Sequence, residues 1–334
     1  MNHVERFRAL MNFEPVDRLP MIEWATYWDK TVERWHGEGL PAEVKDAFDV
    51  GAHFGMDPYR QYWIRPIHWK APQPTHHGAG RVASEADYEA LAPYLYCDEL
   101  LNVPAVEASR EAHARGELVV WLTLEGFFWF PRTLFGIEPH LYAFYDQPEL
   151  MHRMNEELLQ YNLRVIERFC EVLTPEFMTF AEDMSYNHGP MLSKACFDEF
   201  VAPYYRRITP VLKEHGITCI VDSDGDITQA VPWFEAAGVD GILPLERQAG
   251  VDLPTIRKQR PRFCCIGHFD KMTMPHGEEA MRAEFERLLP SMRQGGFVPS
   301  VDHQTPPGVS LDNYRIYLRL LREYCQKAGN GGTR

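Results

Sequence analysis

The chain has 334 residues, of which 45% are hydrophobic and 25% are charged, as in an average soluble globular protein. This composition excludes a disordered or fibrous chain, and the formal net charge of −14 disfavours nucleic acids and anionic membrane surfaces as partners. The longest apolar runs are far shorter than the roughly 20 residues of a membrane span. Seven cysteines without a CxxC pair predict reduced thiols, and the N-terminus lacks the apolar core of a secretory signal. We therefore expect a cytoplasmic protein.

In chain order, a first strand is predicted at Arg18–Trp24, and the sequence does not place a second one before residue 115. After residue 115, short apolar runs alternate with longer amphipathic runs. The predicted strands there are Leu118–Thr123, Phe177–Ala181, Ile217–Val221, Gly241–Leu245, Phe263–Ile266 and Phe297–Val301. The predicted helices are Glu149–Leu173, Phe197–His215, Gly277–Gln294 and Ser310–Gln326.

This alternation of strands and helices predicts parallel strands joined by helical crossovers. We expect an α/β fold, namely a (β/α)8 TIM barrel with an elaborated N-terminal region. Residues 1–328 would form one domain and residues 329–334 a disordered tail. An open doubly wound sheet is the alternative fold. No GxGxxG or GxxxxGK[ST] motif follows a predicted strand, so the sequence gives no support for a nucleotide site.

Acidic residues and a histidine follow the predicted strands, and the C-terminal ends of parallel strands carry the catalytic groups in such folds. Asp222 and Asp224 are alternate residues after one strand, so both are predicted to point into one site. Glu246 and His303 follow two other strands. Two neighbouring carboxylates repel each other unless a cation lies between them. We therefore predict a divalent metal bound by Asp222, Asp224, Glu246 and His303. An Asp in this position can also cap a helix, which is our preferred interpretation for Asp226 and Asp270.

Further residues near the strand ends are candidates for catalysis and substrate binding. Glu182, Asp302 and His188 are the predicted catalytic residues, although His188 can equally be a hydrogen-bonded loop histidine. The predicted substrate-binding residues are Trp24, Trp28, Phe127, Trp129, Asp183 and Tyr186. For each aromatic residue, ordinary packing is the alternative. Arg132 is interpreted either as a partner for a substrate carboxylate or as one half of a surface salt bridge.

The stretches GITCIVDSDGDI, VDGILPLE, CCIGHFDK and GGFVPSVDHQTPPGVSLDNY resemble the uroporphyrinogen decarboxylase superfamily. Among its branches they are most similar to the corrinoid-dependent methyltransferases. The resemblance runs from about Leu118 to Leu321 and implies a (β/α)8 barrel with its site at the C-terminal mouth. The zinc ligands of those methyltransferases, His-x-Cys and a later Cys, fall on Asp222, Asp224 and His303. Glu246 has the spacing of a Glu ligand in cobalamin-independent methionine synthases.

The positions therefore match the family, whereas thiolates are replaced by carboxylates and an imidazole. Because these are harder ligands, the resemblance implies a metal, most simply Zn²⁺, that assists an oxygen leaving group rather than a thiol. We expect a methyltransferase that moves a methyl group from a small O-methyl ether to a corrinoid (cobalamin) carried by a partner protein. A homodimer is a further expected assembly.

Three alternatives remain open: a metal-dependent hydrolase or lyase, a decarboxylase, and a catalytically silent ligand-binding protein. The decarboxylase branch has an Arg-rich N-terminal signature, M-R-Q-A-G-R-Y, whereas residues 22–28 of this chain read IEWATYW and contain no cation.

Overall fold

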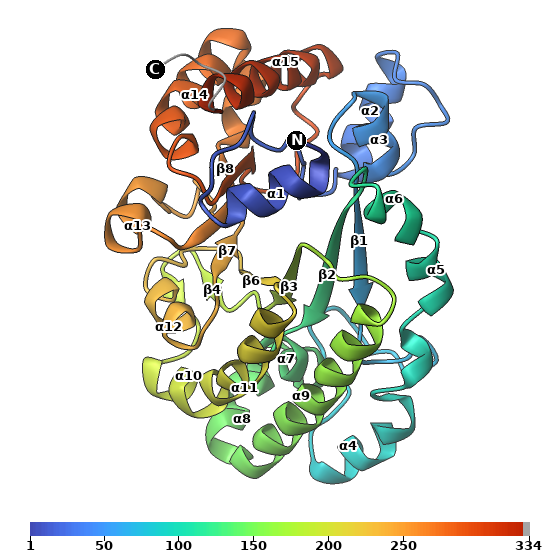
Figure 1. The fold of residues 1–334 in the computed structure, drawn as a ribbon. Helices are drawn as coiled ribbons and strands as arrows, with labels where there is room; N and C mark the ends of the chain where they lie inside the picture. Colours follow the sequence, from blue (N-terminus) through green and yellow to red (C-terminus); the bar gives the residue numbers. More distant parts are fainter. Residues whose placement is uncertain (330–334) are drawn as a thin grey trace. The chain divides into compact units, whose positions relative to one another are not determined.

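The structure is a computed structural model that describes residues 1–329 of the chain (Figure 1). Seven strands form one sheet in the order β1-β2-β3-β6-β7-β8-β9, and β4 and β5 form a separate hairpin. Neighbouring strands are parallel in the pairs β2–β3, β3–β6 and β8–β9. The strands are β1 (Tyr59–Ile64), β2 (Val119–Glu125), β3 (Phe177–Ala181), β4 (Ser185–Tyr186), β5 (Gly189–Pro190), β6 (Thr218–Asp222), β7 (Gly241–Leu243), β8 (Cys264–Phe269) and β9 (Phe297–Val301).

Helices follow the strands along the chain, as the alternation in the sequence predicts. They are α1 (His3–Met11), α2 (Asp29–Gly37), α3 (Ala47–His53), α4 (Glu85–Leu91), α5 (Val103–Glu107), α6 (Arg110–Ala114), α7 (Trp129–Phe135), α8 (Ile137–Asp146), α9 (Pro148–Cys170), α10 (Lys194–Phe200), α11 (Ala202–Glu214), α12 (Val231–Ala236), α13 (Leu253–Gln259), α14 (Glu278–Met292) and α15 (Leu311–Ala328). Short 3-10 turns are η1 (Ala92–Tyr94), η2 (Asp98–Leu100) and η3 (Lys271–His276). Within residues 1–329, none of the helices has the length and hydropathy needed to cross a membrane.

The predicted α/β class with a TIM-barrel-like arrangement is confirmed, and all six strands predicted after residue 115 are present. The strand predicted at Arg18–Trp24 is wrong. This segment is extended without strand pairing, and it meets β9 partly through side chains: the Trp24 backbone N–H donates to Ser300 Oγ at 3.3 Å. Pro20 and Pro299 lack an N–H group, which weakens a regular ladder here. The structure also adds β1, which the sequence did not locate.

The predicted helix Phe197–His215 is in fact two helices, because α10 ends before Val201 and α11 begins at Ala202. Pro203 in the first turn of α11 explains the break, since proline has no N–H to continue the preceding helix but suits a helix start. The apolar face predicted for the long helix before β3 is confirmed in α9, where Met151, Met154, Leu158 and Phe169 are buried.

Contacts between Cα atoms group the described chain into two compact units. Unit 1 comprises residues 1–60, 112–119 and 242 onward, and unit 2 comprises residues 61–111 and 120–241. In unit 1, α14 packs on β8, β9 and α15, and in unit 2, α11 packs on α9 and β6 (Figure 1). The single domain over residues 1–328 stays a prediction. Of the predicted tail, Gly329 caps α15, and residues 330–334 lie outside the described part.

The two faces of the strands in unit 2 differ in polarity. On one face, Thr179 of β3 accepts a hydrogen bond from Trp121 Nε1 at 2.8 Å, and its Oγ1 lies 2.8 Å from Thr123 Oγ1, which accepts from Gln61. On the other face, Tyr62 packs edge-on against Phe169 of α9. Side chains alternate along a strand, so Trp63 and Glu125 belong to the polar face that is turned away from the helices.

Candidate functional site

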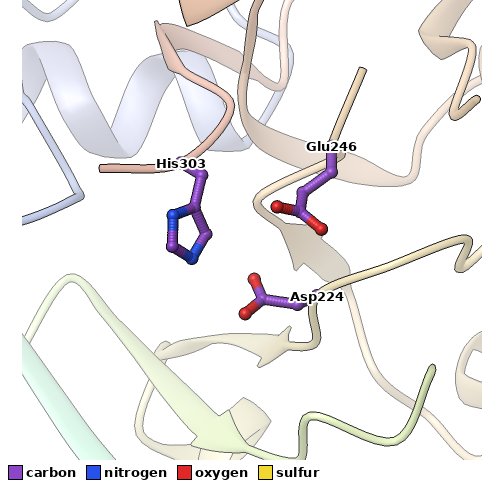
Figure 2. A group of neighbouring side chains, drawn as sticks. All are labelled: Asp224, Glu246 and His303. Carbon is purple, nitrogen blue, oxygen red and sulfur yellow. The ribbon is translucent and has the colours of Figure 1, made fainter. Parts of the chain in front are cut away.

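Three side chains that follow different strands form a group with the composition of a metal site. Asp224, Glu246 and His303 each offer one ligand atom, and these atoms all lie within 4.8 Å of one another. Figure 2 shows the two carboxylates and the imidazole pointing toward one another. All three side chains are half-buried. Three of the four predicted metal ligands are therefore neighbours, from the loops that follow β6, β7 and β9.

Asp222, the fourth predicted ligand, is not part of this group. The prediction assumed that Asp222 and Asp224 lie on one extended strand, but β6 ends at Asp222 and Asp224 belongs to the loop beyond it. Side-chain alternation therefore does not apply across the pair. Burial and the negative charges of Asp224 and Asp183 raise the pKa of Asp222 well above its usual value.

Gly225 fixes the course of the loop that carries Asp224. It adopts a φ of +79°, in the left-handed region that favours glycine. A Cβ atom at this position would lie 2.7 Å from Tyr186 Cα, and the Asp226 N–H donates to Tyr186 O at 2.9 Å. Asp226 accepts a hydrogen bond from the Thr228 N–H and so caps a turn. The prediction that it caps a helix is wrong, because the N-cap of α12 is Ala230.

Asp302 joins the two loops that carry Glu246 and His303. It is fully buried, and its carboxylate accepts hydrogen bonds from the Arg247 N–H at 2.9 Å and from Lys271 Nζ at 3.2 Å. Arg247 directly follows Glu246 in the chain, and Asp302 directly precedes His303. Burial raises the pKa of this carboxyl despite the Lys271 ammonium. The hydrogen bonds link the chain neighbours of the two candidate ligands, and the predicted catalytic role of Asp302 stays a prediction.

His268 makes a hydrogen bond that supports the loop carrying Glu246. Burial lowers its pKa to about 3, so the ring is neutral. Its Nε2 accepts from the Leu253 N–H at 3.2 Å, which leaves Nδ1 as the donor to Leu245 O at 2.9 Å. Leu245 precedes Glu246 and has a φ of +61°, so the histidine holds a strained backbone position directly before a candidate ligand.

Trp24, a predicted substrate-binding residue, lies beside His303. Their ring centroids are 6.3 Å apart with the rings nearly perpendicular, and Trp24 Nε1 donates to Val301 O at 2.6 Å. This contact gives the imidazole one aromatic wall. Trp28 is 46% exposed at the N-terminus of α2. Its predicted role in substrate binding stays a prediction.

Glu182, predicted to be catalytic, organises the turn that precedes α7. It is fully buried and accepts hydrogen bonds from the N–H groups of Phe127, Phe128 and Trp129 and from Tyr205 Oη. Burial raises its pKa to about 7, although these donors oppose the shift. Both oxygens are engaged by the turn and by Tyr205, which gives Glu182 a structural role, and its predicted catalytic role stays a prediction.

Two aromatic residues of that turn were predicted to bind substrate. Phe127 is wholly buried against Phe180, Tyr204 and Tyr205, so it belongs to the core and the prediction is corrected. Trp129 is partly exposed, and the Arg132 guanidinium lies over its ring at 4.9 Å.

Arg132 also donates to the Asp183 carboxylate at 3.1 Å. Of the two interpretations of Arg132, the salt bridge is confirmed, and Asp183 is its partner.

His188 and Tyr186 lie in the β4–β5 hairpin, which is exposed at both residues. Their rings are 5.6 Å apart. Their predicted roles in catalysis and substrate binding stay predictions.

The structure also brings forward Arg65 and Glu125, which the sequence reasoning had not assigned to a site, beside Trp63, which it had placed in a pocket wall. Trp63 and Arg65, at the C-terminal end of β1, line a pocket of about 720 Å³ within unit 2. Glu125 ends β2 and is buried, and its Oε2 has no hydrogen-bond partner in the described part of the chain. The position of Glu125 at a strand end was the available signal.

Residues 133–324, more than half of the chain, match the uroporphyrinogen decarboxylase (URO-D) family. The chain belongs to this family. The match begins after the N-terminal region in which the Arg-rich decarboxylase signature would lie.

A uroporphyrinogen decarboxylase from Bordetella petrii is 27% identical to this family member over 192 residues, which are 53% of this chain and 51% of that protein. The chain thus matches about half the length of this curated relative.

Solved structures share the fold at low sequence identity. A methyltransferase from Methanosarcina mazei matches with a TM-score of 0.69 and 15% identity, over 97% of this chain and 99% of that one. A putative vitamin-B12-independent methionine synthase from Listeria monocytogenes matches with a TM-score of 0.50 and 11% identity, over 94% and 98% of the chains. These matches show a common TIM-barrel-like architecture along nearly the whole chain.

Proposed function

We propose that this URO-D family member is a metal-dependent methyltransferase that moves the methyl group of a small O-methyl ether to the corrinoid of a partner protein. The observation that carries the proposal is the group of Asp224, Glu246 and His303, whose ligand atoms lie within 4.8 Å of one another. The fold shared with the methyltransferase from Methanosarcina mazei supports the reaction class.

The donor set fits a divalent metal ion. It holds two carboxylates, whose mutual repulsion a cation relieves, and an imidazole that supplies a neutral nitrogen ligand. Zn²⁺ accepts this combination of oxygen and nitrogen ligands. A bound ion would act as a Lewis acid toward the ether oxygen, on which negative charge develops as the methyl group leaves. Oxygen and nitrogen ligands leave the ion harder than thiolates do, which favours an ether over a thiol.

The chain's own residues prepare this site. Asp302 and the Arg247 N–H hold the loops of His303 and Glu246 together, and Gly225 sets the course of the loop with Asp224. Trp24 forms an aromatic wall beside His303. A methoxy-aromatic substrate suits such a wall because flat rings pack edge-on or in offset stacks on an indole.

Metal content tests the site first. Elemental analysis of the undialysed protein should find close to one divalent ion per chain, and Asp224→Ala should remove it together with activity. Asp226→Ala is the matched control two residues away, because Asp226 serves a turn. It should retain the metal at a cost of about 1 kcal/mol in stability. Equal metal loss in both variants, or protein free of metal in which added ions restore no activity, contradicts the assignment.

Methyl transfer is tested by following Co(I)alamin as it converts to methylcobalamin, with methoxybenzoates and methoxyphenols as donors. The conversion should require both protein and donor. Thiols such as coenzyme M or homocysteine should be poor acceptors from methylcobalamin. Efficient thiol methylation without ether demethylation overturns the proposed substrate class.

Decarboxylation of uroporphyrinogen is the second candidate, favoured by the named activity of the Bordetella petrii relative. The absence of a cation from residues 22–28 argues against it, since a polycarboxylate needs cationic partners. Coproporphyrinogen formation in a parallel assay would establish this activity instead.

A further inference from the structure

A pocket of about 720 Å³ lies at the C-terminal end of β1, entirely within unit 2 and lined by none of the three candidate metal ligands. Its wall includes two tryptophans, Trp63 and Trp69, which are 43% and 70% exposed. Exposed indoles are uncommon on a protein surface and provide large flat apolar contacts. The volume matches that of typical small-molecule sites.

The two indoles are held in defined positions. His68 stacks on Trp69 with ring centroids 3.8 Å apart, and His68 itself is buried and accepts the Lys70 N–H. Trp63 Nε1 donates to Glu125 Oε1 at 3.2 Å. Because His68 covers one face of Trp69 and a hydrogen bond holds the edge of Trp63, the exposed parts of both rings are a ready surface for a second flat ring.

Arg65 supplies a positive charge at the same wall. Its guanidinium lies over the Trp63 ring at 4.9 Å, and its Nε is 3.9 Å from Glu125 Oε1, which is beyond hydrogen-bond distance. The side chain is 64% exposed, and among the described residues it donates no hydrogen bond that the structure records. In a chain with a formal charge of −14, a cation held this loosely is available for an external anion.

Two other arginines are already used, whereas the Lys70 ammonium lies 6.0 Å from the centre of the Trp69 ring. Arg81, which also lines the pocket, donates to Pro72 O, Thr133 O and Gln73 Oε1. Arg132, the cation that the sequence suggested for a substrate carboxylate, is paired with Asp183. The acidic residue of the wall, Glu99, is exposed and lies 3.9 Å from His68 Nε2. Arg65 is thus the guanidinium of this wall with its donors open.

We infer that this pocket binds a planar aromatic monocarboxylate, with its ring on the indoles of Trp63 and Trp69 and its carboxylate on the Arg65 guanidinium. A guanidinium offers two parallel N–H groups, which match the two oxygens of a carboxylate. The proposal concerns binding alone, so it does not depend on methyl transfer. If the proposed reaction is correct, such a ligand is also a candidate methyl donor.

Isothermal titration calorimetry with 4-methoxybenzoate and its methyl ester tests the inference. The ester keeps the ring and loses the charge, so it should bind at least about tenfold more weakly. Arg65→Gln should remove this difference, and Trp69→Ala should weaken both ligands. Arg60→Gln is the matched control, because Arg60 is an exposed residue of β1 whose guanidinium lies over Phe48 instead.

A carboxylate can also bind a metal ion, so each titration is repeated with EDTA and with His303→Ala. Binding that survives both belongs to the pocket, and binding lost in both belongs to the metal centre and overturns the inference. Equal affinity for acid and ester, or unchanged affinity in Arg65→Gln, overturns it as well. If 4-methoxybenzoate binds but no methyl transfer occurs, the proposed function is refuted and the inference about this pocket is retained.

Discussion

The carboxylate of Asp302 accepts a hydrogen bond from the backbone N–H of Arg247 at 2.9 Å, and this contact ties together the chain neighbours of two candidate metal ligands. Glu246 precedes Arg247, and His303 follows Asp302. The Lys271 ammonium, 3.2 Å from the same carboxylate, neutralises the buried charge. The geometry of the candidate metal centre thus depends on a residue that offers no atom to the metal.

Replacing Asp302 by Ala should weaken metal binding about 10- to 100-fold, as is typical when a residue that supports the ligands is removed. Asp302→Asn, which keeps an acceptor for the Arg247 N–H, should lose less. Competition with a chromogenic chelator measures the affinity. Asp252→Ala is the control, because Asp252 caps α13 in the same unit, and it should cost about 1 kcal/mol of stability with normal metal affinity. Unchanged metal affinity in Asp302→Ala would show that the hydrogen bond between Asp302 and the Arg247 N–H is not needed for metal binding.

Gly225→Ala should disturb the loop of Asp224 more than backbone strain alone explains. A Cβ there would lie 2.7 Å from Tyr186 Cα, whereas Gly216, with a similar φ of +72°, has nothing within 4 Å of its Cβ position. Gly216→Ala should therefore cost about 1 kcal/mol from the left-handed backbone, and Gly225→Ala should cost more and also reduce metal content. Urea unfolding and elemental analysis of both variants give the comparison. The prediction fails if the two variants behave alike.

Glu23 should make the chain less stable as the pH rises. Burial raises its pKa from 4.5 to about 7, although Ser300 and Tyr317 donate to its carboxylate. The folded chain then keeps a proton that the unfolded chain releases, so this contribution to the free energy of unfolding falls between about pH 4.5 and 7. Relative to the wild type, Glu23→Gln should gain up to about 3 kcal/mol between pH 5 and 7.5, measured by urea unfolding. A constant difference between the two proteins across this range contradicts the prediction.

Glu182→Ala should destabilise the turn before α7 strongly, because three backbone N–H groups and Tyr205 Oη would lose their acceptor. Each buried donor left unsatisfied costs about 1–3 kcal/mol. Glu182→Gln keeps acceptor capacity and should cost much less, measured by thermal unfolding. If Glu182 were a catalytic acid instead, Glu182→Gln would abolish activity in a fully stable protein.

A structural element can be predicted from the sequence when the residues that determine it lie within the element itself. Strands β3 and β9 have the predicted bounds because each is a continuous apolar run with clear limits. Strand β1 was not predicted because its sequence, YRQYWI, mixes polar and aromatic residues. The mixture reflects its two faces, of which one is polar and the other packs against a helix. Three of the predicted metal ligands lie close together because each follows the C-terminal end of a strand of the same sheet. The hydrogen bonds of Glu182 could not be predicted, since their donors lie in a turn 53–55 residues away in the sequence.

The hydrogen bond from Trp24 Nε1 to Val301 O joins residues 277 positions apart, and a parallel bridge pairs Tyr27 with Thr305 nearby. Such distant contacts are slow to form because the long intervening loop must first be closed. During synthesis, the aromatic wall beside His303 therefore cannot assemble until the segment with Val301 and His303 has left the ribosome. Trp24 then contacts Ser300 and Val301 of β9, the last strand in the order of the sheet, and an edge strand left without such contacts is a template for pairing with another chain. Truncation of the first 28 residues should consequently promote aggregation as well as loss of the site.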